Sequence, residues 1–456
     1  MSVSLLVRIL WLRRALRGRE RWSREELLAH QRRELGRLRD FACARSPFYQ
    51  RLHRGLERAP LEELPVVTKA DLMGSFDQVS TDPAVRLADL QQYLAVAGDE
   101  EVFAGRYSVS ATSGSSGLRS VIPSNRQEWA TVIASYARAN EWSGIRAGLR
   151  RPTRLAVVSS TTVWHQSSRV ATTVRSRFVD SERLDAGTPL PRLADRLNEI
   201  QPEVLVAYAS MLRALAGEQM EGRLRIAPRA VSSSSEVLTS QVRDMVMRAW
   251  GVPPFDVYAA TETGGIAAEC DRHLGMHLFE DLVIPEVVDS HYRPVPDGQP
   301  GDRLLVTVLF SRTLPLIRYE MTDRVEVATH RCTCGRPFRL LAGVEGRTDD
   351  VLELPGARAG ETVRVHPVVF HRALDLVEAS GWQVRQEPGG LSVLIASPAQ
   401  GFDPVGLERN LTEALASAGA LLPAVRVCVV DAIPAGPTGK RPLVVAGTRP
   451  QAGTVG

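Results

Sequence analysis

Residues 227–258, APRAVSSSSEVLTSQVRDMVMRAWGVPPFDVY, contain the alternation that decides the fold. The apolar runs Ala227–Ser232 and Phe255–Tyr258 are typical of buried strands, and the segment Thr239–Trp250 between them has helical spacing. Further runs of both kinds precede them, namely the strand-like Leu155–Val158 and Val204–Ala207 and the helix-like Leu190–Ile200. This alternation predicts an α/β domain with a largely parallel sheet.

The chain on either side of this pattern predicts a protein of three parts. Residues 1–90 are expected to form a helical N-terminal arm that packs on a large domain, residues 91–345. That domain is predicted to consist of layered α/β sheets and to become β-rich after residue 266, with Leu304–Leu309 as its clearest strand. Residues 346–456 are predicted to form a small α+β domain with strands Leu391–Ile395 and Val425–Val430 around a helix at Leu407–Ala418.

The composition is that of a folded protein. The 456 residues are 44% hydrophobic and 24% charged, with a formal net charge of +4, which excludes a disordered chain. No apolar run approaches the roughly 18 residues of a membrane-spanning helix, and Arg8 interrupts the short N-terminal apolar stretch, which argues against a secretory signal. The chain has only five cysteines, an odd number, which argues against a disulfide framework. A cytoplasmic, reduced protein is therefore expected. Cys43 and Cys428 are interpreted as core fillers.

The first 60 residues are strongly basic, with 15 arginines against 6 acidic residues. Their apolar residues recur at helical spacing, which is compatible with an amphipathic helix on a membrane or on nucleic acid. It is equally typical of a helical arm that packs on the main domain. No recognisable nucleic-acid motif is present, so the packing arm is favoured, with no nucleic-acid partner and no stable membrane insertion.

Five short polar motifs lie along the chain in a fixed order. A Ser/Gly loop can hold phosphate oxygens, and a Thr-Glu turn after a strand can place a carboxylate on Mg²⁺. Each motif alone is also typical of an ordinary polar turn, and the first is similar to the Gly-Ser-Ser-Gly stretch of amidase-type serine hydrolases. The five are Thr112–Gly117, Tyr258–Gly265, Arg318–Asp323, Gly346–Asp350 and Gly436–Lys440.

Taken together, the ordered motifs resemble the adenylate-forming superfamily of acyl-CoA synthetases and peptide-synthetase adenylation domains. The resemblance is closest to the phenylacetate–CoA ligase and CapK-like branch, because Pro47-Phe48-Tyr49 and Leu64-Pro65-Val66-Val67-Thr68-Lys69 match two elements of its N-terminal region. It covers about residues 25–445. An amidase would not explain the last four motifs.

The resemblance implies a nucleotide site that binds ATP and Mg²⁺. Glu262 would bind Mg²⁺, Thr261 would contact the α-phosphate, and Asp323 would take the ribose hydroxyls with Arg347 alongside. The β- and γ-phosphates would lie on the Ser/Gly loop and the adenine on a segment that usually contains Gly-Gly-Glu. The residues implied here are Thr112, Ser113, Gly114, Ser115, Ser116 and Gly117 for the phosphates, and Ser234, Ser235, Glu236 and Tyr258 for the rest of the nucleotide.

The resemblance also implies a two-step ligase reaction. Lys440, one of only two lysines in the chain, would bridge the acid carboxylate and the α-phosphate. The small domain would then turn about a hinge at Asp349 and admit the acceptor, most commonly coenzyme A. An amide synthetase that uses an amine is the alternative, because the segment after the hinge departs from the phenylacetate-ligase pattern. A non-catalytic binding module with the same fold is a further alternative.

The identity of the acid is left open by the sequence. Trp164 and His165 follow a predicted strand where the family has an aromatic residue or a histidine near its acid, although such a pair often serves packing alone. Tyr208 and Ala259 would line the same pocket, and the small residues there favour an aromatic or aryl-alkyl acid. In the phosphate loop, Arg119 either replaces a cation of the usual Gly-Lys-Pro sequence or faces elsewhere.

Cysteines and a histidine from two segments could form a structural zinc site. Cys270 and His277 lie shortly after the Thr-Glu turn, and Cys332 and Cys334 lie just before the hinge. Three thiols and an imidazole make up a tetrahedral ligand set for Zn²⁺, but Cys-x-Cys is tighter than the usual Cys-x₂-Cys spacing. Ordinary buried thiols are the alternative.

Overall fold

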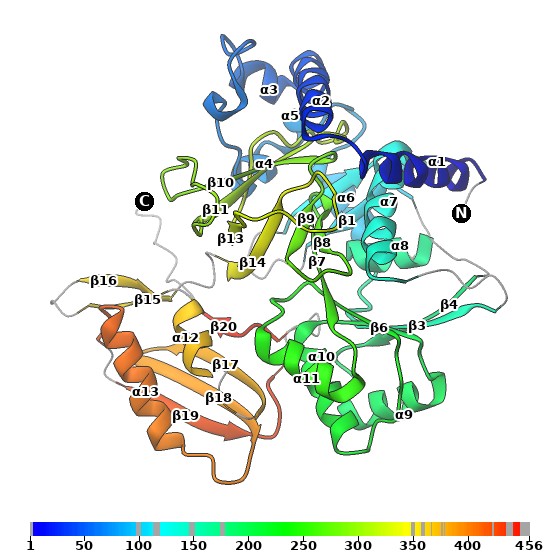
Figure 1. Cartoon of the computed structure of the whole chain (residues 1–456). Coiled ribbons are helices and arrows are strands. Elements are labelled where there is room, and N and C mark those ends of the chain that lie inside the picture. Colours follow the sequence, from blue (N-terminus) through cyan, green and yellow to red (C-terminus); the bar gives the residue numbers. More distant parts are fainter. Residues whose placement is uncertain are drawn as a thin grey trace.

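The structure is a computed structural model, and it describes most of the chain. The described residues are 3–96, 102–112, 119–145, 151–173, 178–347, 352–356, 361–365, 367–374, 377, 379–421, 424–434 and 441–446. Figure 1 shows a large body made of the first three quarters of the chain, with a smaller unit below it formed by the C-terminal part. None of the described helices is both long enough and apolar enough to cross a membrane.

Helices dominate the N-terminal hundred residues. Helix α2 begins with a capping box, in which the Ser23 hydroxyl and the Glu26 carboxylate each satisfy a backbone N–H of the first turn. Helix α4 has the same device, with Thr68 and Asp71. The elements are α1 (Val3–Arg19), α2 (Arg24–Arg45), α3 (Pro47–Leu52), a 3₁₀ turn (Leu61–Glu63), α4 (Lys69–Gly74), α5 (Phe76–Val79) and α6 (Leu87–Val96).

The core of the large body is a nine-stranded mixed sheet of order β13-β14-β9-β8-β7-β6-β5-β3-β4. Strands β4, β3, β5, β6 and β7 run parallel, and the remaining pairs are antiparallel. The strands are β3 (Thr153–Ser159), β4 (Val179–Asp185), β5 (Val204–Ala207), β6 (Ala230–Ser234), β7 (Pro254–Ala260), β8 (Gly264–Glu269), β9 (Met276–Leu278), β13 (Asp323–Val327) and β14 (Leu340–Arg347).

Helices and two smaller sheets surround this sheet. Leu193 and Leu197 of α9 pack against the parallel strands together with Leu212 of α10 and Val242 of α11. The other elements are α7 (Arg126–Trp142), α8 (Gln166–Thr173), α9 (Leu190–Ile200), α10 (Ala209–Met220), α11 (Ser240–Trp250), the pair β1 (Ser108–Ala111) and β2 (Val121–Ser124), and the sheet of β10 (Val283–Val288), β11 (Arg303–Val308) and β12 (Tyr319–Met321).

The C-terminal unit has its own apolar core. Trp382, Phe370 and Leu411 are almost fully buried in it, so the unit does not depend on the large body for its core. Its four-stranded sheet has the order β19-β18-β17-β20 and is covered by two helices. The elements are β15 (Leu352–Pro355), β16 (Thr362–Val365), α12 (Pro367–Leu374), β17 (Ala379–Glu387), β18 (Gly390–Pro398), α13 (Pro404–Ser417), β19 (Val425–Val430) and β20 (Val444–Val445).

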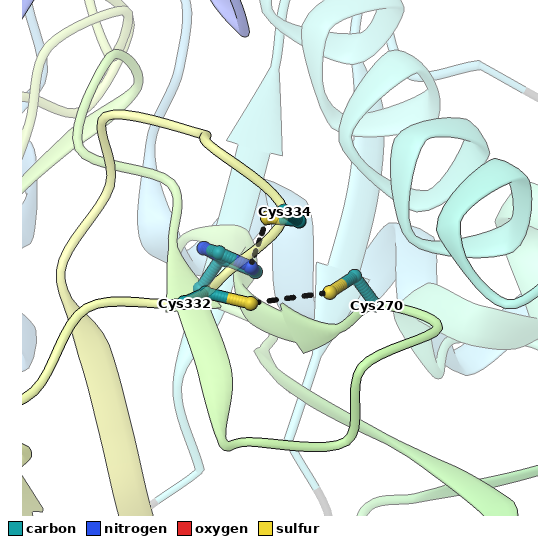
Figure 2. Close-up of side chains that lie close together, drawn as sticks. Cys270, Cys332 and Cys334 are labelled. Atoms are coloured by element: carbon teal, nitrogen blue, oxygen red, sulfur yellow. Dashed lines mark hydrogen bonds between the residues drawn. The ribbon is translucent and has the colours of Figure 1, made fainter.

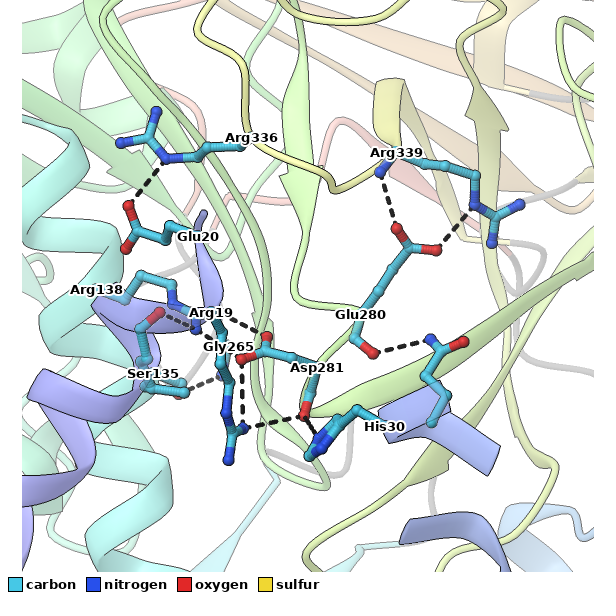
Figure 3. A network of polar contacts seen from close by, with 12 residues as sticks. Arg19, Glu20, His30, Ser135, Arg138, Gly265, Glu280, Asp281, Arg336 and Arg339 are labelled. Carbon is cyan, nitrogen blue, oxygen red and sulfur yellow. Dashed lines mark hydrogen bonds and ion pairs between the residues drawn. The ribbon is translucent and has the colours of Figure 1, made fainter. Parts of the chain in front are cut away.

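A buried network ties the N-terminal helices to the large body (Figure 3). Arg138 of α7 donates to both carboxylate oxygens of Asp281, at 2.7 and 2.8 Å, and both side chains are almost fully buried. Arg19 lies 3.4 Å from the same carboxylate, and a ring nitrogen of His30 lies 3.0 Å from the Asp281 carbonyl oxygen. The pair keeps the pKa of Asp281 below its usual value although burial opposes this. Helices α1 and α2 are therefore fixed to the segment between β9 and β10.

Candidate functional site

Four of the predicted site segments lie at the carboxyl ends of the parallel strands of the central sheet. Strands β3, β5, β6 and β7 are adjacent and parallel, so their carboxyl ends point the same way. In open α/β sheets, ligands bind in the crevice outside these ends. The residues that follow the four ends are Trp164 and His165 after β3, Tyr208 after β5, Ser235 and Glu236 after β6, and Thr261 and Glu262 after β7.

The Thr-Glu turn between β7 and β8 is held from two sides. The Gln166 side chain donates to the Thr261 carbonyl oxygen at 2.9 Å, and the Tyr136 hydroxyl lies 3.1 Å from the Gln166 oxygen. The Tyr319 hydroxyl lies 3.4 Å from a carboxylate oxygen of Glu262. Gly264 has a φ of +72°, which favours glycine there. The turn thus presents Glu262 from a fixed backbone.

The tyrosine and aspartate of two different motifs meet beside this turn. The Tyr258 hydroxyl donates to a carboxylate oxygen of Asp323 at 2.7 Å. The register between β7 and β8 shifts after Tyr258, which leaves Ile266 of β8 without a partner, and such bulges often re-aim side chains near functional sites. Asp323 is the first residue of β13 and pairs in register with Arg347, the last residue of β14. The structure therefore places the backbones of the two predicted ribose-site residues opposite each other.

Glu236 joins the large body to the C-terminal unit. One of its carboxylate oxygens accepts a hydrogen bond from the backbone N–H of Ser210 at 2.8 Å, and the other accepts from the backbone N–H of Arg441 at 3.1 Å. Before it, Ser234 ends β6 and Ser235 has a φ of +69°. Arg441 directly follows Lys440 in the sequence, but Lys440 and Asp349 lie outside the described residues.

The base of the Ser/Gly loop is closed by its two flanking residues. The Thr112 hydroxyl accepts from the Ser120 N–H at 2.9 Å, and the Thr112 N–H donates to the Ser120 carbonyl oxygen at 3.0 Å. Ala111 N–H donates to the Trp164 carbonyl oxygen at 2.9 Å, so the loop begins beside the segment after β3. The loop residues Ser113, Gly114, Ser115, Ser116 and Gly117 lie outside the described part of the chain.

Arg119, at the other end of this loop, stacks on Trp164. Its guanidinium carbon lies 4.5 Å from the centre of the indole ring, a distance typical of a cation–π contact. Two of its nitrogens, Nε and Nη2, are buried and have no hydrogen-bond partner in the described part of the chain. Burial lowers the pKa of this guanidinium.

The residues predicted for the acid pocket differ in their surroundings. The Tyr208 hydroxyl accepts a hydrogen bond from the Ser160 N–H at 2.8 Å, and burial raises its pKa to about 12. Tyr208 is therefore a neutral, fixed side chain. Trp164 and His165, which follow β3, and Ala259, near the end of β7, are partly exposed. The assignment of these four residues to an acid pocket stays a prediction.

The structure adds three residues that the motifs do not contain or do not assign. Gln166 and Tyr136 support the Thr261 backbone, and Tyr319 contacts Glu262. Tyr319 belongs to the motif Arg318–Asp323, so the sequence did contain a signal that this residue lies near the site. Gln166 and Tyr136 lie on helices with no distinguishing local pattern, and only the fold brings them to the turn.

A second site is built from three cysteines and a histidine, whose ligand atoms all lie within 4.8 Å of one another. The sulfur atoms of Cys270 and Cys332 are 3.7 Å apart, and that of Cys334 lies 3.3 Å from Nε2 of His277. Figure 2 shows the three thiols close together, with Cys270 on one segment and Cys332 and Cys334 on another. Because a disulfide needs about 2.05 Å between its sulfurs, these thiols are not bonded, and all five cysteines are free.

The distances match the edges of a tetrahedral metal site. Ligand bonds of about 2.3 Å to sulfur and 2.05 Å to nitrogen place two sulfurs about 3.8 Å apart and a sulfur and nitrogen about 3.5 Å apart. Burial and the charge of Arg336 lower the pKa of His277 to about 4, which leaves the ring neutral and able to ligate. Burial would raise the pKa of Cys334, but hydrogen bonds from the backbone and side chain of Arg336 outweigh it and lower that pKa. The donor set therefore fits a metal ion that prefers sulfur and nitrogen.

Comparisons with known proteins agree with the motifs. No family model matches the chain. Among curated proteins, a phenylacetate-coenzyme A ligase of Thermus thermophilus is 27% identical over 364 residues, 75% of each chain. The phenylacetate-coenzyme A ligase of Pseudomonas putida is 26% identical over 272 residues, and the protein CapK of Staphylococcus aureus is 22% identical over 282 residues. These two matches span 57% and 54% of the relatives' own lengths.

Solved structures share the whole architecture. A 2-hydroxyisobutyryl-CoA ligase in the postadenylation state has a TM-score of 0.68 at 20% identity, over 90% of this chain and 87% of that one. The same ligase in its thioesterification state gives 0.59, over 94% and 92% of the two chains. The chain is thus related in sequence to the phenylacetate–CoA ligases and to CapK, and its fold is that of the acyl-CoA ligases of the adenylate-forming superfamily.

Proposed function

We propose that the chain is an ATP-dependent carboxylic acid ligase. It joins an acid to AMP with release of pyrophosphate and then passes the acyl group to coenzyme A. The relatives named as phenylacetate–CoA ligases support the acid–CoA class, and a structure of the 2-hydroxyisobutyryl-CoA ligase holds an acyl-AMP together with CoA. The small residues near the strand ends support an aromatic or aryl-alkyl acid.

The convergence of separate motifs at one sheet edge carries this proposal. Thr261 and Glu262 adjoin Tyr258 and Asp323, and Glu236 lies one strand away. Attack of a carboxylate on the α-phosphate brings two anions together, so such a site needs fixed cations and hydrogen-bond donors. We assign Mg²⁺ to Glu262, the ribose to Asp323 and Arg347, and the adenine to the segment Ser234–Glu236.

We also assign the catalytic and hinge roles, which fall on residues outside the described part of the chain. Lys440 neutralises the reacting carboxylate and the α-phosphate, and the loop Ser113–Gly117 holds the β- and γ-phosphates. The small domain, residues 346–456, turns about Asp349 between the two half-reactions. Such a cycle uses ATP, Mg²⁺ and coenzyme A, so we place the protein in the cytoplasm.

Pyrophosphate release with Mg·ATP across a panel of aromatic and short-chain acids, each with and without coenzyme A, tests the proposal. We expect turnover that requires coenzyme A, and a decrease on the order of 10²–10³-fold in acyl-adenylate formation for Lys440→Ala, as for loss of one charge-stabilising group. Full activity of Lys440→Ala would refute the assigned mechanism. Turnover that ignores coenzyme A and rises with an amine would identify an amide synthetase, and silence with every acid would favour a binding module.

We further propose that Cys270, His277, Cys332 and Cys334 hold a structural Zn²⁺. The site connects the end of β8 and strand β9 to the loop between β13 and β14. These two segments are far apart in the sequence. Protein purified without chelator should contain one zinc per chain, and Cys332→Ser should lose it, while the matched control Cys43→Ser should keep it. Well under one zinc in the unaltered protein would refute the site.

A further inference from the structure

Helix α1 has two opposite apolar faces, of which only one is covered. Its inner face packs on α7, where Ile9 is 5% exposed against Trp129. On its outer face, Val7, Leu10 and Trp11 are 60%, 51% and 64% exposed. Since side chains three and four residues apart share one side of a helix, these three form a continuous patch turned away from α7.

This patch is the densest group of exposed apolar side chains in the described part of the chain. With Leu6, four of the twelve large hydrophobic residues that are exposed there lie on α1. Trp11 is the single aromatic residue among those twelve described side chains. Scattered exposed apolar residues are normal, but a contiguous patch marks a surface that another body covers.

Arginines surround the patch without acidic residues. Helix α1 contains five arginines and no aspartate or glutamate. Arg13 and Arg17 pair with Glu141, and Arg19 pairs with Asp281, so these three fasten the helix to the body. Arg8 and Arg14 are exposed and make no ion pair within the described residues. Arg14 follows Leu10 and Trp11 by four and three residues, so it lies within the patch itself.

We propose that this outer face of α1, formed by Val7, Arg8, Leu10, Trp11 and Arg14, docks on an anionic lipid membrane surface. Helices that lie in the membrane interface combine aliphatic and tryptophan side chains with arginine or lysine. The apolar side chains enter the boundary between headgroups and acyl chains, and the free arginines meet the lipid phosphates. The contact is peripheral, because α1 is held by its inner face.

A second copy of the chain is a poorer occupant for this face. A two-fold contact between identical patches would bring Arg8 and Arg14 close to their own copies, and α1 offers no carboxylate to pair with them. Nucleic acid would use the arginines but not the exposed Val7, Leu10 and Trp11. A lipid surface uses both parts of the patch.

The placement of α1 suits such an orientation. Figure 1 shows α1 at the edge of the large body, away from the C-terminal unit. The first 60 residues carry a net charge of +9 by count, whereas the whole chain carries +4, so the rest of the molecule is net negative. An anionic surface therefore attracts the arm and repels the remainder, which leaves the C-terminal unit facing the solution.

Sedimentation of the full-length protein with vesicles tests the docking. We expect binding to vesicles of equimolar phosphatidylglycerol and phosphatidylcholine, which weakens as salt rises, and little binding to phosphatidylcholine alone. The triple variant Val7→Ser, Leu10→Ser, Trp11→Ser should lower the partition coefficient at least about tenfold. Arg8→Gln with Arg14→Gln should lower it about tenfold or more, as for two cations near an anionic surface.

Matched variants distinguish α1 from general stickiness. Met247→Ser and Val405→Ser remove apolar residues that are 50% and 69% exposed on α11 and α13, and they should leave binding unchanged. No vesicle binding by protein of native circular dichroism, or equal binding by the triple variant, would overturn the proposal. A concentration-dependent dimer that the triple variant abolishes would assign the face to a second copy instead. Vesicle binding needs no substrate, so it is independent of the proposed ligase activity.

Discussion

Arg119 is partly buried, and two of its nitrogen atoms have no partner among the described residues. Its guanidinium stacks on Trp164, and the two nitrogens, Nε and Nη2, are themselves buried. Buried donor groups without an acceptor cost free energy unless another group completes their surroundings, and for a cation that group is best an anion. Since Arg119 follows the Ser/Gly loop by two residues, we expect that anion to be a phosphate group of ATP.

Replacing Arg119 by Gln should therefore lower kcat/KM for ATP by about tenfold to a hundredfold, because a hydrogen bond to a charged group is lost. The effect on KM for the acid should be small. Arg126→Gln is a matched control, because Arg126 is an exposed arginine whose side chain contacts the Gly105 carbonyl oxygen. A larger change in KM for the acid than for ATP would show that Arg119 serves the acid pocket instead.

At the scale of elements, β7 carries a largely buried carboxyl group near its beginning, at Asp256. Asp256 lies beside Glu269 of β8 and Arg243 of α11, and Glu269 also contacts His273. Burial and the charge of Glu269 raise the pKa of Asp256 to about 7. An unfolded chain has an aspartate pKa of about 3.9, so between about pH 4 and pH 7 the folded state binds the extra proton. The stability from this group is thus complete below about pH 4 and is lost as pH rises through 7.

Asp256→Asn should remove this dependence. We expect the thermal midpoint of the unaltered protein to fall relative to that of the variant between pH 5 and pH 8, by at least on the order of 2 °C. Asp244→Asn, an exposed change on α11, should leave the pH dependence as it is. Parallel curves for Asp256→Asn and the unaltered protein would show that this carboxyl does not titrate in the range.

The sequence predicted the bounds of individual helices and strands better than the burial of their side chains. The predicted helix Leu190–Ile200 and strand Val425–Val430 coincide with α9 and β19, because apolar periodicity reports which face is buried. The strand expected at Ala227–Ser232 begins three residues later, at Ala230. The prediction that Cys428 fills the core was wrong. Cys428 is exposed, because β19 is an edge strand whose alternate side chains face solvent.

In the candidate site, the sequence predicted which residues take part better than the contacts between them. The motif residues could be named from the sequence because their order resembles that of the adenylate-forming superfamily, and Cys270, His277, Cys332 and Cys334 do come together. The sequence could not predict Gln166 under Thr261 or the stacking of Arg119 on Trp164. Those contacts join segments that meet only when the sheet is assembled, and no local pattern encodes them.

On the scale of the whole molecule, polar contacts of four residue pairs in the described part of the chain hold the C-terminal unit to the large body. Arg213 of α10 donates to the Ala379 carbonyl oxygen at 2.5 and 3.0 Å, and Gln241 of α11 donates to the Val377 carbonyl oxygen at 2.9 Å. Arg441 makes the other two, from its backbone N–H to Glu236 and from its guanidinium to the sulfur of Met211. The fold matches the postadenylation state of the 2-hydroxyisobutyryl-CoA ligase at a TM-score of 0.68 and its thioesterification state at 0.59.

If the C-terminal unit turns between the half-reactions, these contacts exist in only one of its two positions. Arg213→Ala removes a charged donor from that position and should shift the equilibrium by on the order of 1 kcal/mol, about fivefold. Acyl-adenylate formation in a single turnover should slow by about that factor, while transfer to coenzyme A should keep or gain rate. Arg223→Ala is the matched control, because Arg223 follows α10, pairs with Glu218 of that helix and makes no described contact with the C-terminal unit. An equal decrease in both half-reactions would mean that Arg213 stabilises the fold and does not select between two positions of the unit.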